Sequence, residues 1–257
     1  KKKKKKLLKK EVDTSVLKNT TMTPNGALFK TNVKGFLPEL MEDMYNDRVI
    51  YKKKMLEAKQ QYEDTKEPSL LKKISKYDNI QMARKIALNS AYGAIGNQYF
   101  RYYSLAMAEA VTTSGQLSIR WIENKMNEYM NSLLKTDGKD YVIASDTDSI
   151  YVTFGDFIDK FKPKSPVDFL DTIAKEKIEP FITKSYQELA EYTHAYDQKM
   201  FMKREVIADK GIWTAKKRYI LNAWDVEGVR YHEPTLKIMG IEAVKSSTPE
   251  PCIFFFF

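Results

Sequence analysis

The sequence has almost no cysteine and no long apolar run. Cys252 is its single cysteine, which excludes an internal disulfide framework and favours a reducing compartment. No apolar stretch approaches the roughly 18 residues that a membrane-spanning helix needs. The lysine-rich start lacks the apolar region of about 7–15 residues that follows the basic part of a secretory signal. We therefore expect a protein with no membrane partner.

Little net charge remains once the first ten residues are set aside. The 257 residues carry a formal net charge of +9, and residues 1–10 contain eight lysines. Nine minus eight leaves +1 for the other 247 residues. The overall charge therefore gives no evidence for a nucleic-acid partner, and only local clusters of Lys and Arg could supply it.

Both ends of the chain have unusual composition. The first ten residues read KKKKKKLLKK, and Pro249 to Phe257 reads PEPCIFFFF. Lysine and phenylalanine runs correspond to AAA and TTT codons, so we interpret both as homopolymer or frameshift artefacts and give them no functional weight. Four exposed phenylalanines would also promote aggregation. We assign residues 1–22 to an uncertain, low-complexity segment.

Periodicity and breaker residues predict a helical first half. The Asn25-Gly26 pair indicates a turn between short strands within residues 11–35. Charged amphipathic stretches over 38–64 and 70–94, separated by Pro68 and Ser69, predict an antiparallel helical hairpin. A third helix is expected over 105–134. Its apolar residues at helical spacing are Ile119, Ile122, Met126, Tyr129 and Leu133.

The second half mixes strands with a helix. Ser165 before Pro166 predicts a helix start, and Pro180 predicts a break or kink within that helix. Residues 201–245 alternate between short apolar runs and loops. We therefore expect an α+β fold, with antiparallel strands around residues 141–152 and near the end.

Two acids lie one residue apart inside the apolar run YVIASDTDSIYV. In an extended chain Asp146 and Asp148 would point to the same side, where their charges repel. A divalent cation would relieve that repulsion. An EF-hand is excluded because Ile150 and Tyr151 occupy the positions that need an acid or Asn and a glycine. Taken alone, the pattern fits an ordinary turn equally well.

Three further groups of residues suggest phosphate binding. Lys85, Asn89 and Tyr92 follow i, i+4, i+7 spacing and would share one helix face. Arg48 and Lys52 share a face of the preceding helix, and an antiparallel partner could turn them toward Lys85 to hold a triphosphate. The segment AKKRYIL joins three cations to a tyrosine, as in phosphate-backbone contacts. Each group taken alone fits a solvated basic surface at least as well.

Together and in this order, the motifs resemble family B DNA polymerases, closest to the replicative enzymes of T-even-type bacteriophages. KIALNSAYGAIGN resembles the fingers motif, SDTDSIYV resembles the palm motif, and KKRY resembles the motif that holds the primer–template. TPNG, FRYYSL and LKIMGIEAVKSSTP are also similar to the phage branch. The resemblance runs from about Thr23 to Pro249.

The resemblance implies a domain division and a location. It implies a segment leading into the palm at 23–37, a fingers hairpin at 38–97, palm at 98–240 and the start of a truncated thumb at 241–257. It further implies an antiparallel palm sheet like that of DNA and RNA polymerases. The location would be the cytoplasm of a bacterial host, with the protein encoded by a phage.

The resemblance also implies roles for individual residues. Asp146 and Asp148 would bind two catalytic Mg²⁺ ions, with Glu205 as a supporting carboxylate. The other roles would be triphosphate binding by Arg48, Lys52 and Lys85, lining of the base-pair pocket by Asn89 and Tyr92, and the DNA clamp of Lys216, Lys217, Arg218 and Tyr219. Implied partners are primer–template DNA, dNTP, a missing polymerase half and, for the full-length protein, a sliding clamp.

The chain departs from the family pattern in several places. We find no Asp-x2-Ser-Leu-Tyr-Pro-Ser segment upstream of the fingers, and Asp13 and Ser15 in EVDTSVLKN do not match it. The exonuclease and most of the thumb are absent, Lys203 replaces an acid, and a glycine-rich insertion is shortened to ADKG. We therefore expect little or no polymerase activity from this chain alone. A truncated gene product, a split polymerase and a metagenomic fragment remain open origins.

Two other functions compete with this interpretation. A nucleotide-sugar glycosyltransferase also uses Asp-x-Asp after an apolar strand, but it does not explain the Lys85 face or KKRY. A nucleic-acid-binding remnant would keep the DNA clamp and lack catalysis.

Overall fold

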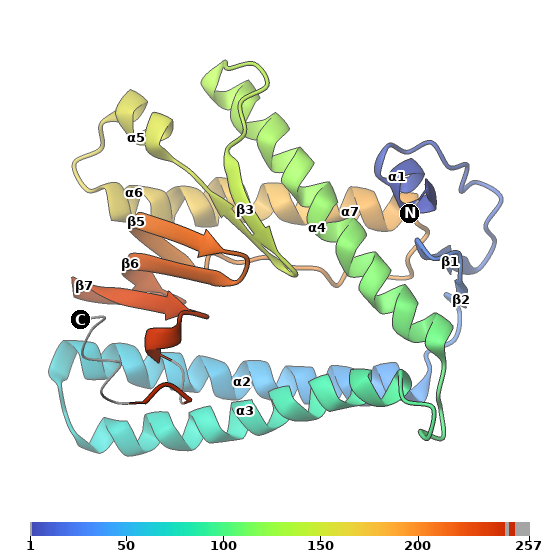
Figure 1. Cartoon of the computed structure of the whole chain (residues 1–257), viewed down its shortest axis with the longest axis horizontal. Helices are drawn as coiled ribbons and strands as arrows, with labels where there is room; N and C mark the ends of the chain where they lie inside the picture. The colour runs from blue at the N-terminus through green and yellow to red at the C-terminus, as the bar shows by residue number, and fades with distance from the viewer. Residues whose placement is uncertain (1, 245–246, 250–257) are drawn as a thin grey trace.

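The computed structural model describes residues 2–244 and 247–249. Cys252 and the phenylalanine run lie outside the described residues. The architecture is α+β, as predicted: long helices accompany three small antiparallel sheets (Figure 1). Within the described ranges, no helix has the length and apolar character to cross a membrane.

Two long helices form the predicted hairpin. Helix α2 spans Phe36–Thr65 and α3 spans Ser69–Ile95, within two residues of the predicted bounds. Lys66 ends α2 in the left-handed region, φ 54°, and its N–H donates to the Tyr62 carbonyl at 2.8 Å. The helices lie side by side along the lower part of Figure 1, where most of their surface remains exposed.

Helix α4 carries most of the core. It spans Leu105–Leu134, as predicted, and begins where the Ser104 side chain accepts a hydrogen bond from the Met107 N–H at 3.3 Å. Ile122 and Met126 of the predicted apolar stripe are fully buried, whereas Leu133 is exposed. The buried stripe on α4 consists of Leu117, Trp121, Ile122, Met126 and Met130. It packs against Ile178, Ile182, Tyr186 and Leu189 of the following helices.

The segment around Pro180 is irregular helix. Helices α5 (Gly155–Phe161) and α6 (Pro166–Ile173) are followed by a π-turn over Ala174–Ile178 and then by α7 (Glu179–Tyr192). A proline lacks an N–H and its ring crowds the carbonyl four residues earlier, which accounts for the irregular turn directly before it. Ser165 precedes α6 as predicted, but its hydroxyl donates to Asp168 Oδ2 at 2.6 Å instead of capping the backbone.

The strands form three separate sheets rather than one palm sheet. Strands β1 (Thr20–Met22) and β2 (Leu28–Lys30) flank the Asn25-Gly26 turn, where Gly26 has φ 94°. Strands β3 (Val142–Asp146) and β4 (Ser149–Val152) pair as a second hairpin. The third sheet has the order β5-β6-β7, from Val206–Ala215, Arg218–Val226 and Val229–Met239. A short 3₁₀ turn, Glu242–Val244, follows.

The lysine-rich start is part of the packed structure. Lys2–Leu8 forms helix α1, and Leu7 is fully buried in the core with α4. Lys10 pairs with Glu188 of α7 and lies 5.4 Å from the Trp121 ring centroid. A segment to which we assigned no weight therefore contributes apolar burial and a cation–π contact to the core.

Candidate functional site

The two acids lie at the tip of the β3–β4 hairpin. The Asp148 N–H donates to the Asp146 carbonyl at 2.5 Å across Thr147, which has φ 45°. Thr147 Oγ1 donates to Asp146 Oδ1 at 2.9 Å. A β-branched residue at positive φ is strained by about 1–3 kcal/mol, a strain typical of functional turns. Asp146 ends β3 and Asp148 lies in the turn, outside both strands, so strand alternation does not extend across the two acids.

A cleft of about 740 Å³ lies beside this turn. Asp148 and Glu205 both line it, and Glu205 precedes β5. The Glu205 carboxylate accepts a bond from Lys237 Nζ of β7 at 2.7 Å. Within the described ranges, no three His, Cys, Asp or Glu side chains gather closely enough to hold a metal ion. The site therefore offers two acids at one tip and a third carboxylate already paired with a cation.

An aromatic cluster joins the acidic turn to the basic hairpin. The Tyr151 ring of β4 lies 5.3 Å from Trp213 of β5 and 5.4 Å from Tyr219 of β6, centroid to centroid. Burial raises the pKa of the Tyr151 hydroxyl, and its hydrogen bond with Tyr219 raises it further. This cluster was not predicted. Its sequence signal was weak, since Tyr151 and Trp213 are 62 positions apart.

The KKRY segment forms the tip of the β5–β6 hairpin and the first two residues of β6. Lys216 and Lys217 are exposed at the tip, and Lys217 has φ 64°. Arg218 Nη2 pairs with Glu242 Oε1 at 3.0 Å. Gly240 lies directly against this tip, since a Cβ at Gly240 would come within 2.1 Å of the Lys217 carbonyl oxygen. The close approach of Gly240 therefore helps to set the position of Lys216 and Lys217.

The helical hairpin separates its three predicted phosphate-binding cations. Arg48 Nε donates to Gln81 Oε1 of α3 at 3.3 Å, one turn from Lys85. Lys52 instead pairs with Glu227 at the β6–β7 turn, with Nζ 2.8 Å from Oε1. Asn89 and Tyr92 lie on the same helix as Lys85, as expected, and all three side chains are exposed. Arg48 thus contacts α3 one turn from Lys85, while Lys52 contacts the β6–β7 turn of the sheet.

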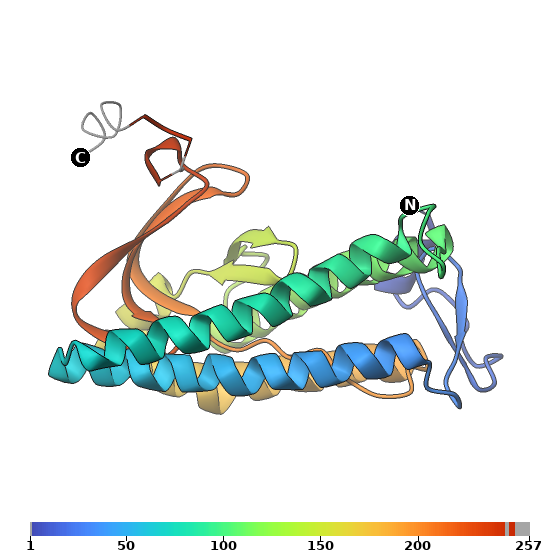
Figure 2. The same cartoon turned by 90° about the horizontal axis from the view of Figure 1, so that it is seen from below.

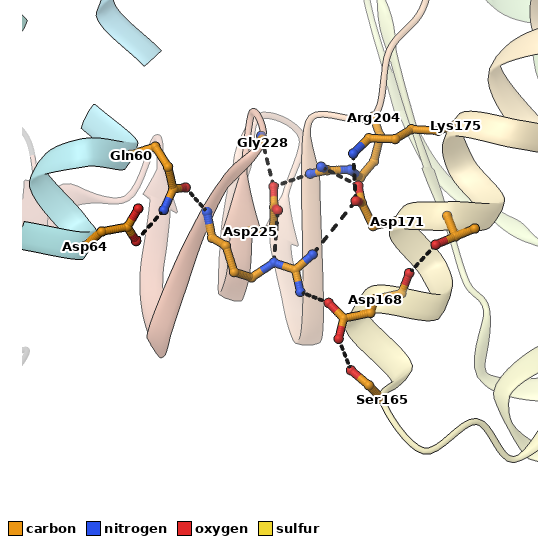
Figure 3. A network of polar contacts seen from close by, with 11 residues as sticks. Gln60, Asp64, Ser165, Asp168, Asp171, Lys175, Arg204, Asp225 and Gly228 are labelled. Carbon is orange, nitrogen blue, oxygen red and sulfur yellow. Dashed lines mark hydrogen bonds and ion pairs between the residues drawn. The ribbon is translucent and has the colours of Figure 1, made fainter. Parts of the chain in front are cut away.

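A buried ionic network holds the base of the third sheet and was also not predicted. Figure 3 shows Asp225 of β6 between two arginines. Asp225 is 2% exposed, and it accepts bonds from Arg204 Nη1 and from Arg230 Nε, the latter at 3.2 Å. Arg204 Nη2 donates to Asp171 Oδ1 of α6 at 2.7 Å. The network fixes Arg204, and with it the backbone of the adjacent Glu205.

Asp171 has a lowered pKa within this network. Burial alone would raise the pKa of its carboxyl, but the hydrogen bond from Lys175 and the charge of Arg204 outweigh burial. The hydroxyl of Ser165 and the guanidinium of Arg230 likewise lower the pKa of Asp168. Both carboxylates are therefore held in the charged form that the arginines need.

Comparison with known proteins gives a consistent family match. A family model described as DNA polymerase family B matches residues 1–247. The DNA-directed DNA polymerase of Escherichia phage RB69 is 40% identical over 283 residues, covering 89% of this chain and 31% of that protein. The DNA-directed DNA polymerase of Enterobacteria phage T4 is 37% identical over 89% of this chain and 32% of its own length.

The similarity extends to eukaryotic proteins over a shorter stretch. The DNA polymerase delta catalytic subunit of Glycine max is 33% identical over 52% of this chain and 12% of that protein. The chain spans about a third of the length of the phage relatives.

Proposed function

This chain belongs to DNA polymerase family B, and from that premise we propose that it forms the fingers and part of the palm of a template-directed DNA polymerase. The reaction would transfer a nucleotide from a dNTP to the primer 3′-hydroxyl. The fingers would be residues 38–97 and the palm 98–240, with 23–37 leading into the palm and 241–257 beginning the thumb.

The cleft beside the Asp146–Asp148 turn carries this proposal. Asp148 and Glu205 face the same cleft, and Tyr219 of the KKRY segment lines its wall. Asp148, Glu205 and the aromatic cluster of Tyr151, Trp213 and Tyr219 come from separate parts of the chain and line this one cleft. That convergence supports a nucleotidyl-transfer site better than three unrelated surface features would.

The donor set fits a hard divalent cation in part. Carboxylate oxygens are ligands that Mg²⁺ prefers, and it commonly keeps several waters beside one or two carboxylates. Asp146 and Asp148 would hold it, with two ions in the complete enzyme. Glu205 is paired with Lys237, and the described residues supply no third acid at the tip, so this chain alone would hold the ions incompletely. When bound, such ions supply charge stabilisation at the reacting phosphate.

The remaining residues would bind and orient the substrates. The triphosphate is a polyanion. Its charge would be neutralised by Arg48 and Lys52 of α2 and by Lys85 of α3. Asn89 and Tyr92 would line the pocket of the new base pair. The duplex backbone would be contacted by Lys216, Lys217, Arg218 and Tyr219. Protein affinity for that backbone comes largely from cations that neutralise its phosphates. Base pairing with the template would select the nucleotide.

Several partners follow from the same proposal. They are primer–template DNA, dNTP, the remaining part of the polymerase and, for the full-length protein, a sliding clamp. The phage relatives support a location in the cytoplasm of the bacterial host.

A primer-extension assay and a binding assay test the proposal. We expect the 257-residue chain to extend a primer little or not at all with Mg²⁺, because its acid set is incomplete. We expect the same chain to bind labelled primer–template, and the templated dNTP to tighten that binding. Robust Mg²⁺-dependent extension that Asp148→Ala abolishes would contradict the expected inactivity. Binding that ignores the templated dNTP would contradict the assignment of the fingers.

A nucleic-acid-binding remnant without catalysis is the second candidate. The exposed Lys216 and Lys217, beside an acid set that is incomplete among the described residues, favour it. Binding of primer–template that weakens with salt and is indifferent to dNTP would support it. Family membership gives no support to the glycosyltransferase alternative.

A further inference from the structure

Helix α2 is docked against the β6–β7 turn by polar contacts. Lys52 Nζ lies 2.8 Å from Glu227 Oε1, and the side chains are 34% and 27% exposed. Two turns further along α2, Gln60 Oε1 accepts a bond from the Arg230 N–H at 2.9 Å. Figure 2 shows the third sheet rising away from α2 from the end that contacts it. The turn is therefore the place where the helical hairpin and the sheet are joined.

The β6–β7 turn holds Glu227 in a strained, fixed position. Glu227 and Gly228 have φ 54° and 88°, which corresponds to a two-residue turn that favours Asn-Gly or Gly-Gly. The Glu227 N–H donates to the Glu205 carbonyl at 2.5 Å, and the Gly228 N–H donates to Asp225 Oδ1 at 2.9 Å. Glutamate is unfavourable at a positive φ such as that of Glu227. Its presence there suggests that the side chain has a function.

The partner of Glu227 is one of the three cations proposed to bind the triphosphate. Lys52 shares a face of α2 with Arg48, which contacts α3 one turn from Lys85. A triphosphate held by these cations would have to take Lys52 from Glu227. Glu227 and a triphosphate therefore compete for the same ammonium group.

We propose that Glu227 is a positioning residue that holds Lys52, and with it α2, against the sheet until a triphosphate displaces it. The inference rests on the proposed function, because it concerns the triphosphate site of the fingers. The Glu227–Glu205 backbone contact places this competition next to the carboxylate that lines the cleft.

Binding of inorganic tripolyphosphate and of a fluorescent dNTP to the full chain tests the competition. We expect Glu227→Gln to bind both probes about two- to fivefold more tightly, the range for losing one partly exposed charge pair. Lys52→Met should weaken binding, and Glu227→Gln should have no further effect in the Lys52→Met background. Glu233→Gln makes the same charge change on β7 and serves as the control.

The outcomes separate this inference from the proposed function. If wild type binds neither probe, or binds them and Lys85→Met changes nothing, the triphosphate site itself is wrong. If wild type binds and Lys52→Met weakens binding, but Glu227→Gln behaves like Glu233→Gln, the role of Glu227 is overturned.

A distance measurement checks the docking of α2 directly. Spin labels on Lys53→Cys and His232→Cys, in a Cys252→Ser background, report the separation of α2 and β7. We expect Glu227→Gln to lengthen or broaden this distance without ligand, and tripolyphosphate to do the same in wild type. An identical distance distribution in wild type and Glu227→Gln, each with and without tripolyphosphate, would overturn the proposal.

Discussion

At the scale of single residues, the buried charges were the least predictable feature. Asp225 is 2% exposed, yet nothing in the sequence distinguishes it from the exposed acids around it. Its partners Arg204 and Arg230 are 21 and 5 positions away and meet it only because β5, β6 and β7 pair. By contrast, the turn that contains Asp146 and Asp148 could be predicted from the sequence, because all of its residues are neighbours in the chain.

Asp171 gives this network a pH dependence with a definite sign. Its folded pKa lies below the unfolded value of about 3.9, since the Lys175 bond and the Arg204 charge outweigh burial. The stability it contributes is therefore fully present above that unfolded value and is lost as pH falls through the folded pKa. We expect Asp171→Asn to lower the urea midpoint at about pH 7. The variant should also lose less further stability than wild type between about pH 5 and pH 3.

Asp137→Asn is the matched control for this measurement. Asp137 lies in the exposed turn after α4, so its substitution removes one carboxylate outside the network. We expect the pH profile of this control to follow wild type. If Asp171→Asn keeps the wild-type slope over that acidic range, Asp171 is not the source of the acid sensitivity.

At the scale of elements, helix bounds and the regions that hold antiparallel strands could be predicted, whereas strand register could not. Residues 38–64 and 70–94 were placed within two residues because Pro68 interrupts a continuous charged pattern. The β5–β6 ladder contains three register shifts, and Gly240 comes close to Lys217 because β7 pairs with β6 up to Met239 opposite Tyr219. Strand pairing and bulges join residues that are distant in sequence, so no local pattern encodes them. For the same reason the burial of Leu7 against α4 was missed.

Gly240 offers a prediction at this scale. Its φ is 66°, and a Cβ added there would lie 2.1 Å from the Lys217 carbonyl oxygen, so any side chain must displace the basic hairpin. We expect Gly240→Ala to lower the melting temperature by several degrees and to weaken primer–template binding, although no charge changes. Gly138→Ala is the control, because Gly138 has φ 61° and nothing lies within 4 Å of its added Cβ.

The comparison isolates the collision from the cost of positive φ. Both variants place alanine in the left-handed region, which costs about 1 kcal/mol. Only Gly240→Ala adds the clash with the hairpin. Equal losses of stability, with DNA binding unchanged in both variants, would show that Gly240 does not position Lys216 and Lys217.

At the scale of the whole molecule, the net charge does not reflect where the cations of the proposed function lie. The net charge of +9 comes almost entirely from eight lysines in residues 1–10, yet these lysines belong to the segment around α1, which packs against α4, and not to the β5–β6 hairpin (Figure 1). The cations that the proposed function uses lie at the β5–β6 hairpin tip and on α2 and α3. Overall charge therefore does not indicate where DNA would bind, whereas the KKRY segment predicts one location.

The salt dependence of DNA binding tests whether the hairpin is that site. Each phosphate contact contributes about −0.9 to the slope of log affinity against log salt on duplex DNA. If Lys216 and Lys217 each contact a phosphate, the double change Lys216→Gln/Lys217→Gln should reduce the slope by about 1 to 2 and weaken binding uniformly across sequences. Lys72→Gln/Lys73→Gln removes the same charge from exposed positions on α3 and should leave the slope nearly unchanged. Equal reductions from both pairs would mean that DNA senses only the total charge, and the hairpin would lose its assignment as the duplex contact.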